Sequence, residues 1–263
     1  MKKVLVALCF ASLASGRASA ELKYTMRTEV QKPEKPASSA PTNPTMAMMG
    51  EALTKQLLPE GTATMTYILG DKGVRVEFVN AAMGQPAGTV TLGQLDGTAV
   101  VLNPKDQTYW KMGPQGAAAA MQAAGLKPEV TSSRTGESET VAGVHCERST
   151  FTLKMDLPIP ENTRALLGAG FPSTIDMSGD TCSTTDQFQK YGELAAKTQA
   201  TSILAAMGID KLTTAGIVLR QALRLGGVEI RSVVTEIAEA DVPAGSFDIP
   251  AGYKEVPPPT GIR

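Results

Sequence analysis

The strongest constraint on the fold is a period-2 alternation of apolar and polar residues, which is clearest near the C-terminal end. Residues 217–237 hold two such runs, and the runs meet at Gly226-Gly227. A two-residue glycine loop between alternating runs is typical of a β-hairpin. In the register that this loop sets, Leu225 opposes Val228, Leu223 opposes Ile230 and Leu219 opposes Val234, and all six share one face. The chain therefore carries a half-buried antiparallel hairpin.

The same register makes two predictions about polar residues. Arg224 opposes Glu229 on the wet face, where they form an exposed ion pair. Gln221 and Ser232 oppose each other on the apolar face. This pair is either a satisfied hydrogen bond in the core or a contact for the polar group of a ligand.

Alternation recurs upstream, between turn signals at residues 70–73, Asp96-Gly97 and residues 103–106. We expect further strands at residues 22–30, 62–69, 74–78, 89–95, 98–103, 108–112, 130–137, 144–155 and 174–177. The prediction is an α+β, mostly β fold with a curved antiparallel sheet and helices over its concave face.

Two helices are expected to pack on this sheet. A Pro-rich linker at 32–44 precedes a Met-rich helix at about 44–58, which ends before Pro59. Its apolar face consists of Met46, Met49, Leu53 and Leu57. This face either covers the sheet or forms an adaptable lid, because methionine packs against varied shapes. A second helix is expected at 184–208, with Thr184 and Gln187 as a capping box.

The first 20 residues are typical of a signal peptide, with Lys2 and Lys3 before an apolar run and a small-residue site that ends at Ala20. We expect cleavage after Ala20, a periplasmic location and one domain over residues 21–263. The removed segment is basic, so the remaining chain is mildly acidic and has no charge that attracts nucleic acid. No later stretch is apolar enough to span a membrane.

Two cysteines remain after cleavage, Cys146 and Cys182. An even pair in an oxidising compartment favours a disulfide. A zinc pair or a redox couple is the alternative, but there is no C-x-x-C motif and His145 is the only histidine.

The sequence offers little for catalysis. It lacks the H-E-x-x-H, G-x-S-x-G and P-loop motifs. His145 follows the strand pattern and is expected at the surface rather than as a general base. We expect no catalytic residues, no metal and no cofactor, and hence a binding or structural protein.

One face of the central strands supplies the candidate ligand-binding residues. Trp110 is either a core residue or a platform for a ligand. The predicted cavity-lining set is Met65, Tyr67, Leu69, Val76, Phe78, Trp110, Gln221 and Ser232.

Three segments resemble a bacterial secreted family known as a domain of unknown function. The tail from Asp241 to Val256 matches the pattern V-P-x-x-x-F-x-I-P-x-G-Y, and it places Phe247, Ile249 and Tyr253 to close the end of the sheet. LNPKDQTYWKM and AGVHCERSTFTL resemble two internal strands of that family. The family is similar to LolA-like periplasmic lipoprotein carriers, which implies a half-barrel with a concave apolar face.

The resemblance implies a carrier of a hydrophobic, lipid-like ligand. The rival hypothesis is an envelope structural or protein-interaction module whose sheet is fully packed and whose partner is another protein.

Overall fold

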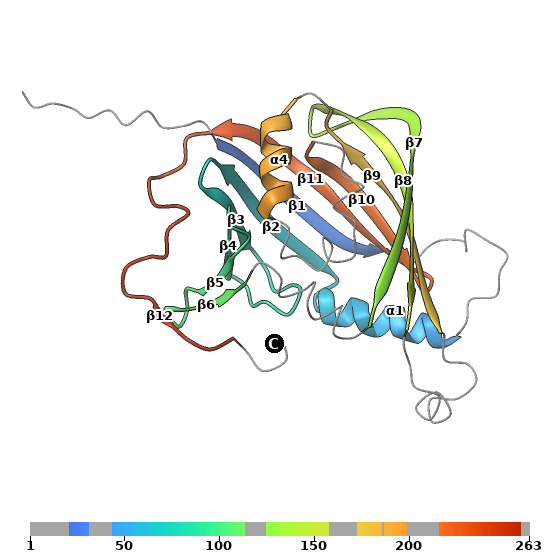
Figure 1. Ribbon diagram of the computed structural model, residues 1–263, viewed down its shortest axis with the longest axis horizontal. Helices are drawn as coiled ribbons and strands as arrows, with labels where there is room; N and C mark the ends of the chain where they lie inside the picture. The colour runs from blue at the N-terminus through green and yellow to red at the C-terminus, as the bar shows by residue number, and fades with distance from the viewer. Residues whose placement is uncertain are drawn as a thin grey trace, which may run out of the picture.

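The computed structural model describes residues 21–31, 44–113, 125–157, 173–185, 187–198 and 216–258. They form one twelve-stranded sheet in the order β12-β6-β5-β4-β3-β2-β1-β11-β10-β9-β8-β7 (Figure 1). All neighbours are antiparallel except β12 and β6. The strands are β1 Glu21–Gln31, β2 Thr62–Gly70, β3 Gly73–Phe78, β4 Val90–Gln94, β5 Ala99–Asn103, β6 Thr108–Met112, β7 Lys127–Val141, β8 Val144–Asp156, β9 Thr174–Ser183, β10 Val218–Leu225, β11 Val228–Ala240 and β12 Lys254–Glu255. The mostly β prediction is confirmed.

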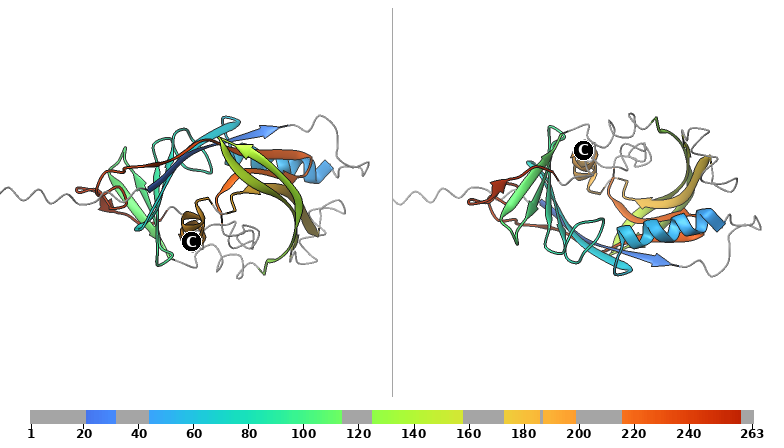
Figure 2. Two further views of the ribbon diagram at one scale, coloured as in Figure 1. Left: turned by 90° about the horizontal axis from the view of Figure 1, so that it is seen from above. Right: turned by 90° about the horizontal axis from the view of Figure 1, so that it is seen from below.

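The sheet is curved and open, and two described helices pack on the same face of it (Figure 2). Helix α4, Gln189–Thr198, contacts β2 and β3, while α1, Pro44–Leu57, contacts the ends of β10 and β11. We call this helix-bearing side the inner face and the opposite side the outer face. Among the described residues, no helix has the length and hydropathy needed to cross a membrane.

The predicted hairpins are confirmed in register. In β2 and β3, Tyr67 pairs with Val76 and Leu69 pairs with Val74, so their apolar side chains share the inner face. The closing hairpin pairs Leu225 with Val228 across Gly226-Gly227, as the two-residue loop requires. Both glycines have positive φ, 56° and 78°, which matches the turn expected between twisted strands.

The first strand and the closing hairpin join the two halves of the sheet. β1 lies between β2 and β11, and Thr28 pairs with Ser232 across 204 residues of sequence. This long-range pairing makes the closing hairpin a central element rather than an edge.

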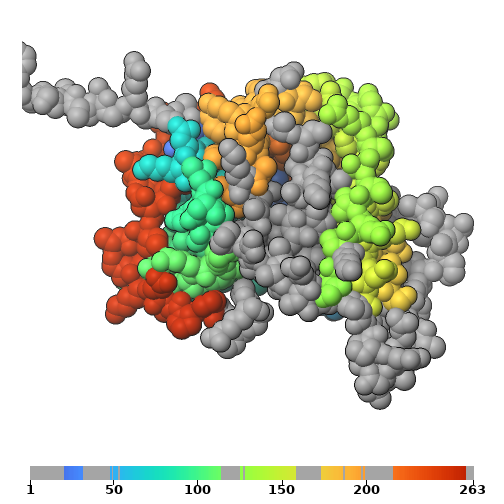
Figure 3. Space-filling model, in the orientation of Figure 1, coloured from blue at the N-terminus to red at the C-terminus, as the bar shows by residue number. Residues whose placement is uncertain are grey.

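The C-terminal tail lies at one end of the sheet, where the two-residue β12 pairs with β6 at the edge. Ile249 and Tyr253 lie against the outer face of β4–β6, so they cover a face near this end and do not plug the end itself. The Arg75 guanidinium donates to the Ser246 carbonyl at 3.1 Å and helps to hold the tail. In Figure 3 the tail lies beside β4–β6 at one side of the molecule, while α4 lies nearer the middle of the view, between β2–β3 and β7–β8.

The region around Cys182 also differs from its prediction. The brief strand at 174–177 is the start of the ten-residue β9, which itself contains Cys182. The capping box at Thr184 is wrong, because α4 begins at Gln189 and the Thr184 hydroxyl accepts a hydrogen bond from the Ile217 amide at 2.9 Å. Thr184 therefore extends strand pairing instead of starting a helix.

The helix expected at 44–58 is confirmed as α1. Residues 1–20, the linker up to residue 43 and residues 199–208 of the second predicted helix lie outside the described residues.

Candidate functional site

The structure brings five of the predicted lining residues together on the inner face of β2 and β3. Met65, Leu69 and Phe78 are almost fully buried, with exposures of 2%, 1% and 7%. Tyr67 and Val76 pair across the two strands and are half-buried. The five side chains form a continuous apolar surface.

Tyr24 extends this surface onto β1. Its ring stacks on that of Tyr67 with 4.7 Å between centroids and 6° between planes. The Tyr67 hydroxyl donates to the Met65 sulfur at 3.6 Å. Burial raises the pKa of Tyr67 to about 12, and burial together with the nearby Tyr67 raises that of Tyr24 well above its usual value. Both phenols therefore stay neutral in this apolar setting.

Trp110 shares the inner face but lies on β6, which β5 and β4 separate from β3. It is 8% exposed and pairs with Val101, so it is a core residue. In α1, Leu57 packs beside the Ala63–Phe78 cluster and Met48 is 73% exposed. The side chains of Met46, Met49 and Leu53 lie outside the described residues.

Several apolar residues on the inner face remain accessible. Met26, Tyr67, Val76, Leu223 and Ile230 are half-buried, although each lies beside fully buried neighbours. Partly exposed apolar side chains are ordinary on folded proteins, but these lie on one face, where an apolar ligand can contact them.

A row of polar side chains crosses the inner face, where the predicted Gln221–Ser232 pair is part of a longer arrangement. Strand pairing places one polar residue of each strand directly beside the next, from β1 through β11, β10, β9 and β8 to β7. These residues, which we call the polar row, are Thr28, Ser232, Gln221, Thr181, Ser149 and Arg134. At ordinary strand spacing the part from β1 to β8 is about 19 Å long.

Apolar clusters flank the polar row on both sides. Toward α4 lie Leu219 and Val234, and toward the opposite strand ends lie Phe151 and Leu223. Thr28 and Ser232 share a hydrogen bond of 2.9 Å. In the described part of the chain, the side chains of Gln221 and Ser149 make no hydrogen bond, and both are half-buried. Their donors and acceptors are available to a ligand.

The outer face of the same strands has the opposite chemistry. Arg220, Arg224 and Arg231 alternate with three carboxylates in a chain of ion pairs. Asp180 lies 3.3 Å from Arg220 and 2.9 Å from Arg224, and Glu229 lies 2.7 Å from Arg224 and 2.6 Å from Arg231. The predicted Arg224–Glu229 pair is therefore confirmed as part of a network.

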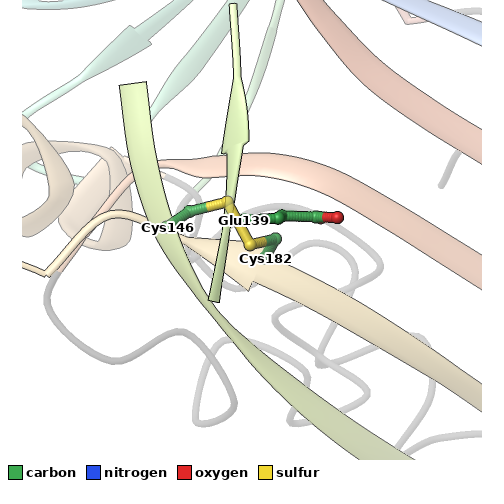
Figure 4. A group of neighbouring side chains, drawn as sticks. All are labelled: Glu139, Cys146 and Cys182. Carbon is green, nitrogen blue, oxygen red and sulfur yellow. A yellow bond between two sulfur atoms is a disulfide. The ribbon is translucent and has the colours of Figure 1, made fainter. Parts of the chain in front are cut away.

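The disulfide between Cys146 and Cys182 is confirmed, and it ties β8 to β9. Glu139 on β7 lies beside the two sulfurs (Figure 4), and its carboxylate accepts a hydrogen bond from Arg220 at 2.5 Å. Thiolates are the metal-binding form of cysteine, so the bonded pair cannot ligate a metal. Both cysteines are fully buried, which favours a structural role.

His145 is exposed on β8 opposite Thr140, as expected for a surface residue. Two described hollows, of about 340 and 270 Å³, lie at the β7–β9 strand ends and beside the β4–β5 turn. Neither is lined by a predicted ligand-binding residue.

The predictions included two members of the polar row and missed four. Gln221 and Ser232 belong to one hairpin, so a local turn sets their register. Thr28, Thr181, Ser149 and Arg134 lie on other strands, and only the strand order brings them into line. The available signal was a polar residue at a position of the apolar face in each alternating run.

Comparisons with known proteins give little further detail. Residues 46–162 match the model of a family described as a domain of unknown function (DUF4412). The expected resemblance to a family of that kind is confirmed at this level. A comparison with curated proteins found no match.

Among solved structures, the chain is similar to "Structure of PNGF-II in C2 space group", with 8% identity and a TM-score of 0.40. The similarity covers 91% of this chain and 31% of that one, so this chain spans about a third of the other's length.

Proposed function

We propose that this protein is an exported, periplasmic carrier that binds a hydrophobic, lipid-like ligand on the inner face, without catalysis. In this proposal the curved sheet is a half-barrel of the lipoprotein-carrier kind. The observation that carries the proposal is the set of half-buried apolar side chains beside the Tyr24–Tyr67 stack. Transfer of acyl methylenes from water to such a surface stabilises a complex by about 0.8 kcal/mol for each buried CH₂.

The chemistry of the two faces supports this choice of side. The outer face of β9–β11 carries the ion-pair network, and an acyl chain there would have to desolvate charges. On the outer face of β4–β6 the tail already covers the apolar residues. The inner face combines apolar side chains with incomplete burial.

The test is binding of N-phenyl-1-naphthylamine, a neutral apolar fluorophore, to the purified mature chain. Val76→Trp adds bulk on the inner face of β3, and Ile68→Trp adds the same indole on the outer face of neighbouring β2. We expect saturable binding that Val76→Trp weakens about tenfold and that Ile68→Trp leaves within twofold, with circular dichroism confirming both folds.

Met26→Trp provides a second inner-face variant if Val76→Trp does not fold. Lipid extraction of the protein from its native envelope followed by mass spectrometry should recover a bound amphiphile. Absence of probe binding together with absence of lipid would reject the proposal and favour the protein-interaction module.

A further inference from the structure

The polar row indicates which chemical class of ligand the inner face accepts. We propose that it binds the uncharged, hydrogen-bonding part of an amphiphile, namely ester or amide carbonyls and hydroxyl groups, while the acyl chain lies on the flanking apolar clusters. This inference rests on the proposed function and specifies its ligand.

The first argument is the unused hydrogen-bonding capacity of the row. A carboxamide offers two donors and an acceptor, and a serine hydroxyl offers one donor and two lone pairs. Gln221 and Ser149 use none of these among the described side chains, although they lie in an apolar surface. Both side chains are half-buried, so water reaches them in the free protein, and a ligand that displaces this water has to supply the hydrogen bonds.

The second argument is the segregation of charge. By strand pairing, all three network arginines lie on the outer face. Of the described side chains on β1 and β7–β11, the charged ones on the inner face are Arg134, Glu147 and Glu239, and all three are exposed. Glu239 is held by Lys190 at 3.6 Å and by the Tyr191 hydroxyl at 3.1 Å.

These charges do not favour an anionic head group near Gln221. The inner face has one cation among them, and Arg134 lies at the edge strand, about three strand spacings, or roughly 14 Å, from β10. A carboxylate or phosphate placed beside Gln221 would lose hydration without gaining a counter-ion from the described side chains of these strands. Neutral carbonyl and hydroxyl groups lose less hydration and match the donors and acceptors of the row.

The geometry also fits an extended polar part. The row runs across the strands for about 19 Å, so several hydrogen-bonding groups of one ligand can reach successive side chains. Half-buried apolar side chains lie on either side of the row, Met26 on β1 and Leu223 on β10, and an acyl chain can contact them along the same face. The combination suits a neutral glycerolipid-like amphiphile better than a ligand with one compact charged head.

The experiment compares two ligands with the same chain, 1-monooleoylglycerol and oleate, as competitors of N-phenyl-1-naphthylamine on the mature chain. We expect monooleoylglycerol to bind at least tenfold more tightly than oleate at pH 8. Gln221→Leu, a change of similar size, should weaken monooleoylglycerol about fivefold and leave the fluorophore within twofold. Ser149→Val provides a second variant with the same expectation.

Two controls separate this inference from the proposed function. Thr152→Val removes a hydroxyl from the outer face of β8, where it bonds Thr131, and should change neither ligand. Equal affinity for both ligands, with no effect of Gln221→Leu, would overturn the proposed ligand class. Binding of the fluorophore in the same experiment would still support the proposed carrier function. If the protein prefers oleate and Arg134→Gln abolishes that preference, the proposed neutral ligand class is overturned in favour of an anionic ligand. Loss of all binding in the wild type would reject the proposed function itself.

Discussion

The two faces of β10 and β11 carry polar groups of opposite kinds: charged side chains that pair with one another on the outer face, and the uncharged side chains of the polar row on the inner face. On the outer face, three arginines and three carboxylates neutralise one another, and Asp180 and Glu229 each contact two guanidiniums. On the inner face, the polar row is uncharged from Thr28 to Ser149 and carries a charge only at Arg134 on the edge strand, and Gln221 has no described partner. A face whose charges form ion pairs with one another is typical of a solvent-exposed surface. A face with neutral, unused hydrogen-bonding groups among apolar side chains is suited to a ligand.

The comparison predicts that changes on the outer face affect stability while ligand binding persists. The largest effect is expected for the double variant Cys146→Ser, Cys182→Ser, which removes the buried cross-link beside the network. A bond spanning 36 residues contributes about 3–4 kcal/mol in the chain-entropy description. Urea unfolding of both proteins measures the loss. A change below 1 kcal/mol would show that strand pairing alone holds β8 to β9.

A smaller loss is expected for Asp180→Asn, which leaves Arg220 and Arg224 without their shared carboxylate. Breaking a fully buried pair costs about 3–5 kcal/mol, and the partial exposure of both arginines reduces this to about 2 kcal/mol. Asp176→Asn is the matched control on the same face of β9, since Asp176 is exposed and has no described ion pair. Equal stability of the two variants would contradict a structural role for the network.

The burial of Tyr67 on the inner face should make the unfolding free energy depend on pH in the alkaline range. The pKa of Tyr67 is raised to about 12, whereas an unfolded tyrosine titrates near 10. The folded state holds this proton more tightly, so the contribution is complete below pH 10 and is lost as pH rises toward 12. Tyr67→Phe should make the unfolding free energy fall less steeply over that range, by at most about 2 kcal/mol. Parallel pH profiles of the two proteins would contradict the burial of this phenol.

Local patterns were sufficient to predict the hairpins but not the arrangement of the sheet. The glycine loop at 226–227 sets the register of β10 and β11, and both predicted pairings appear. The partner of Thr28 lies 204 residues away, so no turn in the sequence indicates it. The capping box at Thr184 failed because its hydroxyl binds the amide of Ile217, a residue distant in sequence. The polar row follows the same rule, since only its two hairpin residues, Gln221 and Ser232, were accessible to prediction, whereas the lining residues of β2 and β3 belong to one predicted hairpin.

The most direct measurement is photo-crosslinking of the mature chain with a monoacylglycerol that carries a diazirine in its acyl chain. Residue-level mass spectrometry would identify the labelled positions on β1–β3, where the two faces alternate along each strand. The account predicts labels at Met26, Tyr67 and Val76, and their disappearance when unlabelled monooleoylglycerol is added. Labels at the outer-face neighbours Ile68 and Arg75 instead, or equally on both faces, would contradict it.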